Sequence, residues 1–139
     1  HRTGLYDGVL IKDNHLAFAA ELGQAPAAAV VQARAKVAEL ASEGAGELPI
    51  EVEVDSLEQL RNVLGAAPDI ALLDNMPPDL LQQAVAIRNE LAPVVVLEAS
   101  GGINLSTVAS VAATGVDRIS VGALTHSARV LDFGLDWRR

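Results

Sequence analysis

Short polar clusters hold most of the residues that could do chemistry, and each cluster follows an apolar run. They lie at residues 12–15, 53–55, 74–75, 98–102 and 122–127. Glu53 and Asp74 end two successive apolar runs, so two carboxylates would lie side by side. Such a pair can hold ribose hydroxyls or a divalent cation, and it can stabilise positive charge on a sugar carbon. An acidic residue at a strand end can instead cap the next helix, which is the better interpretation for Asp55, just before Ser56.

Basic residues near these clusters indicate an anionic ligand. His1, Arg2 and Lys12 form the most concentrated basic group, and arginine suits a carboxylate that it can bind through two parallel hydrogen bonds. A surface arginine and a lysine that extends into solvent would explain these residues equally well. A lysine at a strand end could also form a Schiff base. His15 and His126 lack a second histidine at metal-site spacing, so we expect no protein metal site and a structural hydrogen bond for His15.

Two glycine turns are candidates for phosphate binding. The first, LEASGGI at residues 97–103, precedes a predicted helix, so backbone N–H groups and a helix dipole could face an anion. An ordinary turn would use the same glycines. The second, ISVGALTHS at residues 119–127, follows the next predicted strand, and adjacent glycine loops at the last two strands are the usual phosphate site of βα barrels. The predicted phosphate-binding residues are Ser100, Gly101, Gly102, Val121, Gly122 and Ala123.

The elements that must position these clusters alternate along the chain. Nearly continuous runs of Val, Ile and Leu predict parallel strands buried on both faces, at residues 8–11, 50–54, 70–73, 94–97 and 118–121. Helical patterns lie between them, at residues 26–42, 56–64, 77–91 and 105–113. The helix ends have physical signals: Ser56 with Gln59 forms a capping-box pattern, Pro77 suits a first turn, and Gly65 and Gly115 suit C-caps.

This alternation predicts an α/β fold. From residue 50 onward the predicted strands start about 20 to 24 residues apart, which favours a βα barrel with its active site at the carboxyl ends of the strands. About five strands cannot close an eight-stranded barrel, so we expect a partial βα barrel whose other strands precede residue 1. Because no linker divides the 139 residues, we expect residues 1–139 to be a single domain. Residues 43–48 are predicted to form a loop.

Composition and charge narrow the range of functions. The formal net charge of −8 argues against binding to nucleic acid or to an anionic membrane. The longest apolar-rich stretch, residues 25–41, is interrupted by Arg34, Lys36 and Glu39, so no membrane span is expected. The absence of cysteine rules out disulfides and fits a reducing cytoplasm, which is the location that we expect. The chain opens with neither an initiator Met nor a signal segment, so we expect it to come from the middle of a protein.

Five motifs in order cover almost the whole chain: HRTGLYDGVLIKDNH, IEVEVDSLEQL, IALLDNM, LEASGGI and GVDRISVGALTHS. Together they resemble quinolinate phosphoribosyltransferase, also called nicotinate-nucleotide pyrophosphorylase. The resemblance implies an enzyme of NAD biosynthesis that transfers phosphoribosyl from phosphoribosyl pyrophosphate to the ring nitrogen of quinolinate. Loss of a carboxylate as carbon dioxide then leaves nicotinate mononucleotide, and Mg²⁺ accompanies the pyrophosphate.

The resemblance also implies roles for individual residues. His1, Arg2 and Lys12 would contact the quinolinate carboxylates, with His126 as a weaker candidate. Lys12 would also join Glu53 and Asp74, which face the ribose, as the catalytic residues. The two glycine turns would hold phosphate.

Family members also carry an N-terminal α/β domain and further barrel strands that this sequence lacks, and they bind substrate across a dimer. The resemblance therefore implies a homodimer or higher homo-oligomer for the full-length enzyme, with basic ligands supplied from outside these residues. Three alternatives stay open: a pyrophosphorylase for another base, a non-catalytic phosphate- or nucleotide-binding fragment, and, as a distant third, a Schiff-base aldolase that uses Lys12.

Overall fold

The computed structural model describes residues 7–42, 46 and 48–126. Strands and helices alternate through these residues. The strands are β1 Val9–Ile11, β2 Ile50–Val54, β3 Ile70–Asp74, β4 Val96–Ser100 and β5 Arg118–Ile119. The helices are α1 Asp13–Glu21, α2 Pro26–Ser42, α3 Leu57–Leu64, α4 Pro78–Leu91, α5 Val108–Ala112 and α6 Ala123–His126. None of the helices in this part of the chain is both long and apolar enough to cross a membrane.

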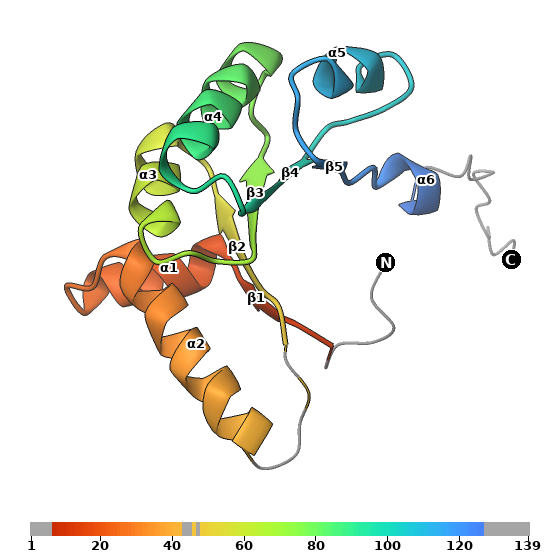
Figure 1. Ribbon diagram of the computed structural model, residues 1–139. Coiled ribbons are helices and arrows are strands. Elements are labelled where there is room, and N and C mark those ends of the chain that lie inside the picture. Colours follow the sequence, from red (N-terminus) through yellow and green to blue (C-terminus); the bar gives the residue numbers. More distant parts are fainter. Residues whose placement is uncertain (1–6, 43–45, 47, 127–139) are drawn as a thin grey trace, which may run out of the picture.

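All five strands of the described residues form one parallel sheet, in the order β1-β2-β3-β4-β5. Helices α1 to α4 gather on one side of this sheet (Figure 1). A doubly wound sheet would reverse its strand order and carry helices on both faces, whereas sequential order with one-sided cover is the arrangement of a βα barrel. The predicted partial βα barrel of about five strands is confirmed.

The two faces of the sheet differ, as β2 shows. Ile50, Val52 and Val54 are almost completely buried, whereas Glu51 and Glu53 between them are only partly buried. The prediction that the strands are buried on both faces is therefore wrong for β2. Alternation along a strand sends successive side chains to opposite faces, so one face of β2 packs under helices and the other points toward the open side of the sheet.

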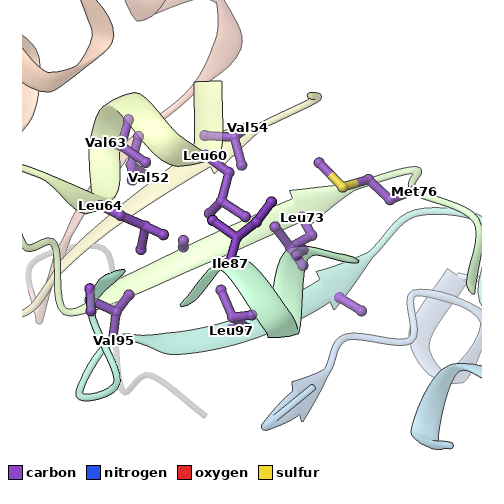
Figure 2. Packing of buried hydrophobic residues seen from close by; sticks show 14 of the residues in the cluster. Val52, Val54, Leu60, Val63, Leu64, Leu73, Met76, Ile87, Val95 and Leu97 are labelled. Carbon is purple, nitrogen blue, oxygen red and sulfur yellow. The ribbon is translucent and has the colours of Figure 1, made fainter. Parts of the chain in front are cut away.

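A single hydrophobic core lies between the sheet and its helices. Figure 2 shows side chains of β2, β3 and β4 packed against those of α3 and α4, including Val52, Val54, Leu60, Val63, Leu73, Ile87 and Leu97. The helix α3 presents its buried residues at helical spacing, and these are Leu60, Val63 and Leu64. This core fixes the positions of the strand ends, and with them the polar clusters.

The predicted helix signals are largely confirmed. Helix α2 has the predicted bounds. Ser56 is the N-cap of α3, its Oγ accepts the Gln59 N–H at 3.3 Å, and the Gln59 Oε1 accepts the Asp55 N–H at 3.2 Å. Gly65 is the C-cap of α3. Gly115 lies beyond the end of α5 and has a φ of 88°, which glycine adopts without strain.

Three predicted elements have wrong bounds, and one helix was missed. Strand β4 begins at Val96 instead of residue 94, because Pro93 and Val94 form a turn closed by the Val95 N–H and the Ala92 carbonyl. Strand β5 stops at Ile119, and α5 is shorter than predicted. Helix α1 was not predicted at all, since its first residues were interpreted as a polar loop after β1.

An arginine and an aspartate close the amino ends of the strands at two places, which we call the Arg–Asp clamps. In the first, Asp69 Oδ2 accepts the Ile50 N–H at 2.7 Å and an Arg34 N–H at 2.9 Å. In the second, Asp117 Oδ2 accepts the Leu97 N–H at 2.8 Å and an Arg88 N–H at 2.6 Å. Each clamp joins a helix, the strand after it and the start of the next strand, at the end of the sheet opposite the polar clusters.

Candidate functional site

Parallel pairing brings Lys12, Glu53 and Asp74 to the carboxyl ends of β1, β2 and β3. Ile11 is the last residue of β1 and pairs with Val52, so Lys12, which follows β1, comes level with Glu53 in β2. Glu53 pairs with Leu72, and Asp74 lies two positions beyond Leu72 on the same face of β3. The predicted neighbourhood of these three residues is confirmed, while their catalytic role stays a prediction.

The electrostatics of Glu53 show how close these charges are. Burial raises the pKa of Glu53 above its ordinary value of 4.5, and the negative charges of Asp74 and Asp13 raise it further. The ammonium group of Lys12 lowers it, but by less than the burial raises it. Lys12 itself is exposed, and Glu53 and Asp74 are half-buried. The result is a carboxyl group whose proton affinity is raised mainly by burial and is modified by the charges of Lys12, Asp74 and Asp13.

Asp74 is held by its neighbour in the chain. The side-chain amide of Asn75 donates to Asp74 Oδ2 at 2.7 Å. The backbone N–H of Asn75 donates to the Ser100 carbonyl at 2.9 Å, which ties the end of β3 to the end of β4. Asp74 and Ser100 are also paired in the sheet. The sequence-based prediction named Asp74 and Ser100 but assigned no role to Asn75.

The first glycine turn follows directly from β4. Gly101 and Gly102 both have positive φ, of 92° and 63°. Ser100 is the last residue of β4, and Gly102 is exposed, with open space where a Cβ would stand. Two successive glycines with positive φ form a tight turn of the kind whose backbone N–H groups can bind an anion.

The helix dipole predicted to support this turn is not in place. Residues 103–107 separate Gly102 from α5, and Asn104 and Thr107 close local turns within that segment. Because the dipole effect is confined to the first turn of a helix, α5 contributes nothing to an anion at Gly101 and Gly102. The backbone amides of the glycine turn are the predicted donors that the structure leaves in place.

The second glycine turn lies beside the first because β4 and β5 are neighbours. Ser120 follows β5, and its N–H donates to the Ala99 carbonyl at 2.9 Å. The Ser120 hydroxyl donates to the Glu98 carboxylate in the middle of β4. Val121 is half-buried, Gly122 and Ala123 are exposed, and Ala123 begins the short helix α6. Phosphate binding by either turn stays a prediction.

The remaining predicted residues fall into two groups. His1 and Arg2 lie outside the described residues, and His126 is the last residue of α6. His15 makes the predicted structural hydrogen bond: its Nδ1 accepts the Lys12 N–H at 2.9 Å. This bond caps α1 and fixes the backbone at Lys12, so His15 positions a candidate residue without facing the site itself.

Two links near the site were missed by sequence reasoning. Asn75 could have been found, because an Asp-Asn pair at a strand end often marks a position with positive φ, which Asn tolerates better than other side chains. The hydrogen bond from Ser120 to Glu98 could have been predicted only with the correct bounds of β4. Placing β4 at residues 96–100 puts Leu97 and Ala99 on the buried face and Glu98 on the open one.

Comparisons with known proteins agree with this geometry. The family model "Quinolinate phosphoribosyl transferase, C-terminal domain" matches residues 1–136. A carboxylating nicotinate-nucleotide pyrophosphorylase from Mycobacterium leprae is 51% identical over 136 residues, which is 98% of this chain and 44% of that protein. The carboxylating nicotinate-nucleotide pyrophosphorylase of Rattus norvegicus is 36% identical over 136 residues, covering 97% of this chain and 42% of that protein.

Solved structures give the same result. The nicotinate-nucleotide pyrophosphorylase from Francisella tularensis superposes with a TM-score of 0.73 at 39% identity, covering 90% of this chain and 39% of that one. The chain thus spans less than half the length of each of these relatives. Strand order, rim residues and the match over residues 1–136 together show that the chain belongs to the quinolinate phosphoribosyl transferase family, to whose C-terminal domain it corresponds.

Proposed function

We propose that the protein carrying this chain transfers phosphoribosyl from phosphoribosyl pyrophosphate to the ring nitrogen of quinolinate. Loss of one carboxylate as carbon dioxide then gives nicotinate mononucleotide and pyrophosphate. One observation carries the proposal: Lys12, Glu53 and Asp74 lie at the same strand ends as two adjacent glycine turns. The names of the relatives support the choice of substrates.

Glu53 and Asp74 provide negative charge where the reaction develops positive charge. Transfer of a ribosyl group passes through a state with positive charge on the sugar carbon, and fixed carboxylates stabilise that charge. Their half-buried setting strengthens the effect, because water screens it less. Asp74 keeps one oxygen bonded to Asn75, which leaves the other available to the ribose.

The cations and the glycine turns bind the acidic parts of the two substrates. Lys12 lies beside Glu53 and is exposed, so its ammonium group can meet a carboxylate of quinolinate. His1 and Arg2 are proposed to bind quinolinate, and His126 is a weaker candidate. The turns at Gly101 and Gly122 are proposed to bind the phosphate of the ribosyl group through backbone amides.

Magnesium is proposed to accompany phosphoribosyl pyrophosphate. Glu53 and Asp74 fit this ion, because Mg²⁺ prefers a few carboxylate oxygens together with phosphate oxygens. When bound, the ion neutralises charge on the leaving pyrophosphate.

We also propose that the protein is a cytoplasmic homodimer or a higher homo-oligomer. Two polyanionic substrates need more positive charge than a chain of net charge −8 supplies from Lys12 and its neighbours. A partner chain or residues outside this segment would provide it.

The test is the release of carbon dioxide from quinolinate by the full-length protein in the presence of phosphoribosyl pyrophosphate and Mg²⁺. We expect release that requires both substrates, and a fall of about 100-fold or more in kcat for Glu53→Gln. Binding of nicotinate mononucleotide without turnover would favour the nucleotide-binding alternative. Borohydride trapping of a carbonyl substrate on Lys12 would favour the aldolase.

A further inference from the structure

Asn75 is constrained more tightly than an exposed residue at a strand end needs to be. Its φ is 53°, in the left-handed region that costs most side chains about 1–2 kcal/mol. Only two non-glycine positions of the described chain adopt positive φ, and the other is Ala67. Asn is one of the few residues that tolerates this conformation, because its short amide can bond locally.

The conformation of Asn75 brings its side chain to the candidate carboxylate. The amide Nδ2 donates to Asp74 Oδ2 at 2.7 Å. An adjacent residue with extended backbone would point its side chain to the opposite face of the sheet. The left-handed turn therefore lets the residue that follows Asp74 reach back and hold its carboxylate.

The same residue lies against the first glycine turn. A Cβ added at Gly101 would stand 2.2 Å from the Asn75 Oδ1 and 2.9 Å from the Asn75 backbone nitrogen. The Asn75 N–H also donates to the Ser100 carbonyl at 2.9 Å. Gly101 thus has two reasons to be glycine: its φ of 92° and the space that Asn75 occupies.

We propose that Asn75 is a positioning residue that sets the distance between the Asp74 carboxylate and the Ser100–Gly102 turn. One side chain both orients the carboxylate and packs under the turn, so the two parts of the site move together. This inference rests on the proposed function, in which Asp74 faces the ribose and the turn holds the phosphate of the same ligand. A ligand that spans both groups needs their separation to be fixed.

Two substitutions in the full-length protein distinguish the contribution of the Asn75 side chain from that of its backbone conformation. Asn75→Gly keeps the positive φ but removes the amide, and we expect a stably folded protein with KM for phosphoribosyl pyrophosphate raised and kcat lowered, each at least about 5-fold. Asn75→Asp keeps the size and replaces a donor with a negative charge. It cannot donate to the Asp74 carboxylate, so its KM for phosphoribosyl pyrophosphate should rise at least as far as in Asn75→Gly.

A double-mutant cycle tests the contact with the turn. Gly101→Ala forces a methyl group against Asn75, so Gly101→Ala should impair binding of phosphoribosyl pyrophosphate strongly. Adding Asn75→Gly to it should cost clearly less than Asn75→Gly costs alone, because part of the clash is removed. Effects that simply multiply would show that the two positions act independently.

Ala67→Gly is the matched control, since it relieves the other positive φ at the far end of the sheet. Its kcat and KM should equal those of the wild type. Isothermal calorimetry of phosphoribosyl pyrophosphate binding in the presence of Mg²⁺ tests the positioning role of Asn75 separately from the proposed reaction. A wild type that binds this ligand without turnover would defeat the proposed reaction, and the dissociation constants would still decide the role of Asn75. Wild-type values in Asn75→Gly, or no binding by the wild type, would overturn the inference.

Discussion

The raised pKa of Glu53 makes the stability of the fold depend on pH. Its pKa is raised by burial and by neighbouring acids, so the folded protein holds the Glu53 proton more tightly than the unfolded chain does. Stability contributed by this group is therefore complete below its ordinary pKa of 4.5 and is lost as the pH rises above it. Above that pH, ionising Glu53 costs the folded protein more free energy than it costs the unfolded chain, mainly because the carboxylate is partly desolvated.

We predict that Glu53→Gln raises the melting temperature at pH 7 while it lowers kcat by about 100-fold or more. The amide has the same shape and no charge to desolvate. Thermal unfolding measured from pH 4 to pH 8 should show the gain growing with pH. A melting temperature that falls equally at every pH would mean that Glu53 is held mainly by stabilising hydrogen bonds.

Sequence reasoning succeeded at the residue scale where strand ends alone decide position. Glu53 and Asp74 were predicted to lie side by side, with Lys12 on the same rim, because parallel strands end at one edge of the sheet. That rule does not depend on side-chain detail. It could not find the hydrogen bond from Asn75 to Asp74, since this depends on one φ value. Nor could it find how far the Gly101–Gly102 turn is separated from α5. The separation comes from local turns that the Asn104 and Thr107 side chains form, and the pattern of residue types does not reveal these hydrogen bonds.

At the scale of elements, the two Arg–Asp clamps compare a buried arginine with an exposed one, while the two aspartate side chains are similarly exposed, at 40% and 43%. Arg88 is 7% exposed and also donates to the Val95 carbonyl at 2.7 Å. The Arg34 side chain is 43% exposed. Water has little access to the Arg88 guanidinium, so removing this arginine leaves its partners in the second clamp without a donor. Water can reach Arg34 and can replace the hydrogen bonds of the first clamp.

We predict that Arg88→Met lowers the free energy of unfolding by about 2–4 kcal/mol, and Arg34→Met by about 1 kcal/mol or less. Denaturant titration of the two variants gives the comparison directly. Equal losses would show that burial of the arginine is not what gives the second clamp its strength.

The second clamp should also respond to acid. Burial raises the pKa of Asp117, but the Leu97 N–H and the Arg88 guanidinium together lower it more, so it lies below its ordinary value of 3.8. A lowered pKa contributes stability that is present above pH 3.8 and is lost as the pH falls through the folded-state value. Asp117→Asn should therefore destabilise the protein at pH 6 and much less near pH 2, as thermal unfolding at the two pH values would show.

The link between Ser120 and Glu98 joins the residue after β5 to the middle of β4, two residues before the first glycine turn begins. Since the hydroxyl donates to the carboxylate, Glu98→Gln keeps an acceptor and Glu98→Leu does not. We predict that Glu98→Leu raises KM for phosphoribosyl pyrophosphate about 3- to 10-fold, and that Glu98→Gln stays near the wild type. Steady-state kinetics of both variants test this, and equal effects would assign Glu98 to charge instead of position.

At the scale of the whole molecule, the face of the sheet opposite α1 to α4 carries no helix layer from the described residues (Figure 1). A cavity of about 840 Å³ lies on it, lined among others by Leu10, Ile70 and Leu72 together with Glu51 and Glu98. Within the described residues, β1 and β5 each pair on one side only. A partly apolar face beside two strand edges that each pair on one side only favours association.

We predict that the 139-residue chain on its own sediments as a species heavier than 14.5 kDa, with a mass that rises with protein concentration. Sedimentation velocity across a tenfold concentration range measures this. A concentration-independent mass of one chain would contradict the prediction, and would mean that the open face is satisfied within the chain.

The Arg–Asp clamps have a consequence for how the rim is assembled. Each clamp closes the chain into a ring, one from Arg34 to Asp69 and the other from Arg88 to Asp117, and the rings do not overlap. Glu53 belongs to the first ring and the Ser100–Gly102 turn to the second, while Asp74 and Asn75 lie on the span that joins them. The candidate site thus takes residues from two chain segments, each closed by its own ion pair, and from the span between them. A fragment that contained only one of these segments would hold some of the site residues but could not form the site.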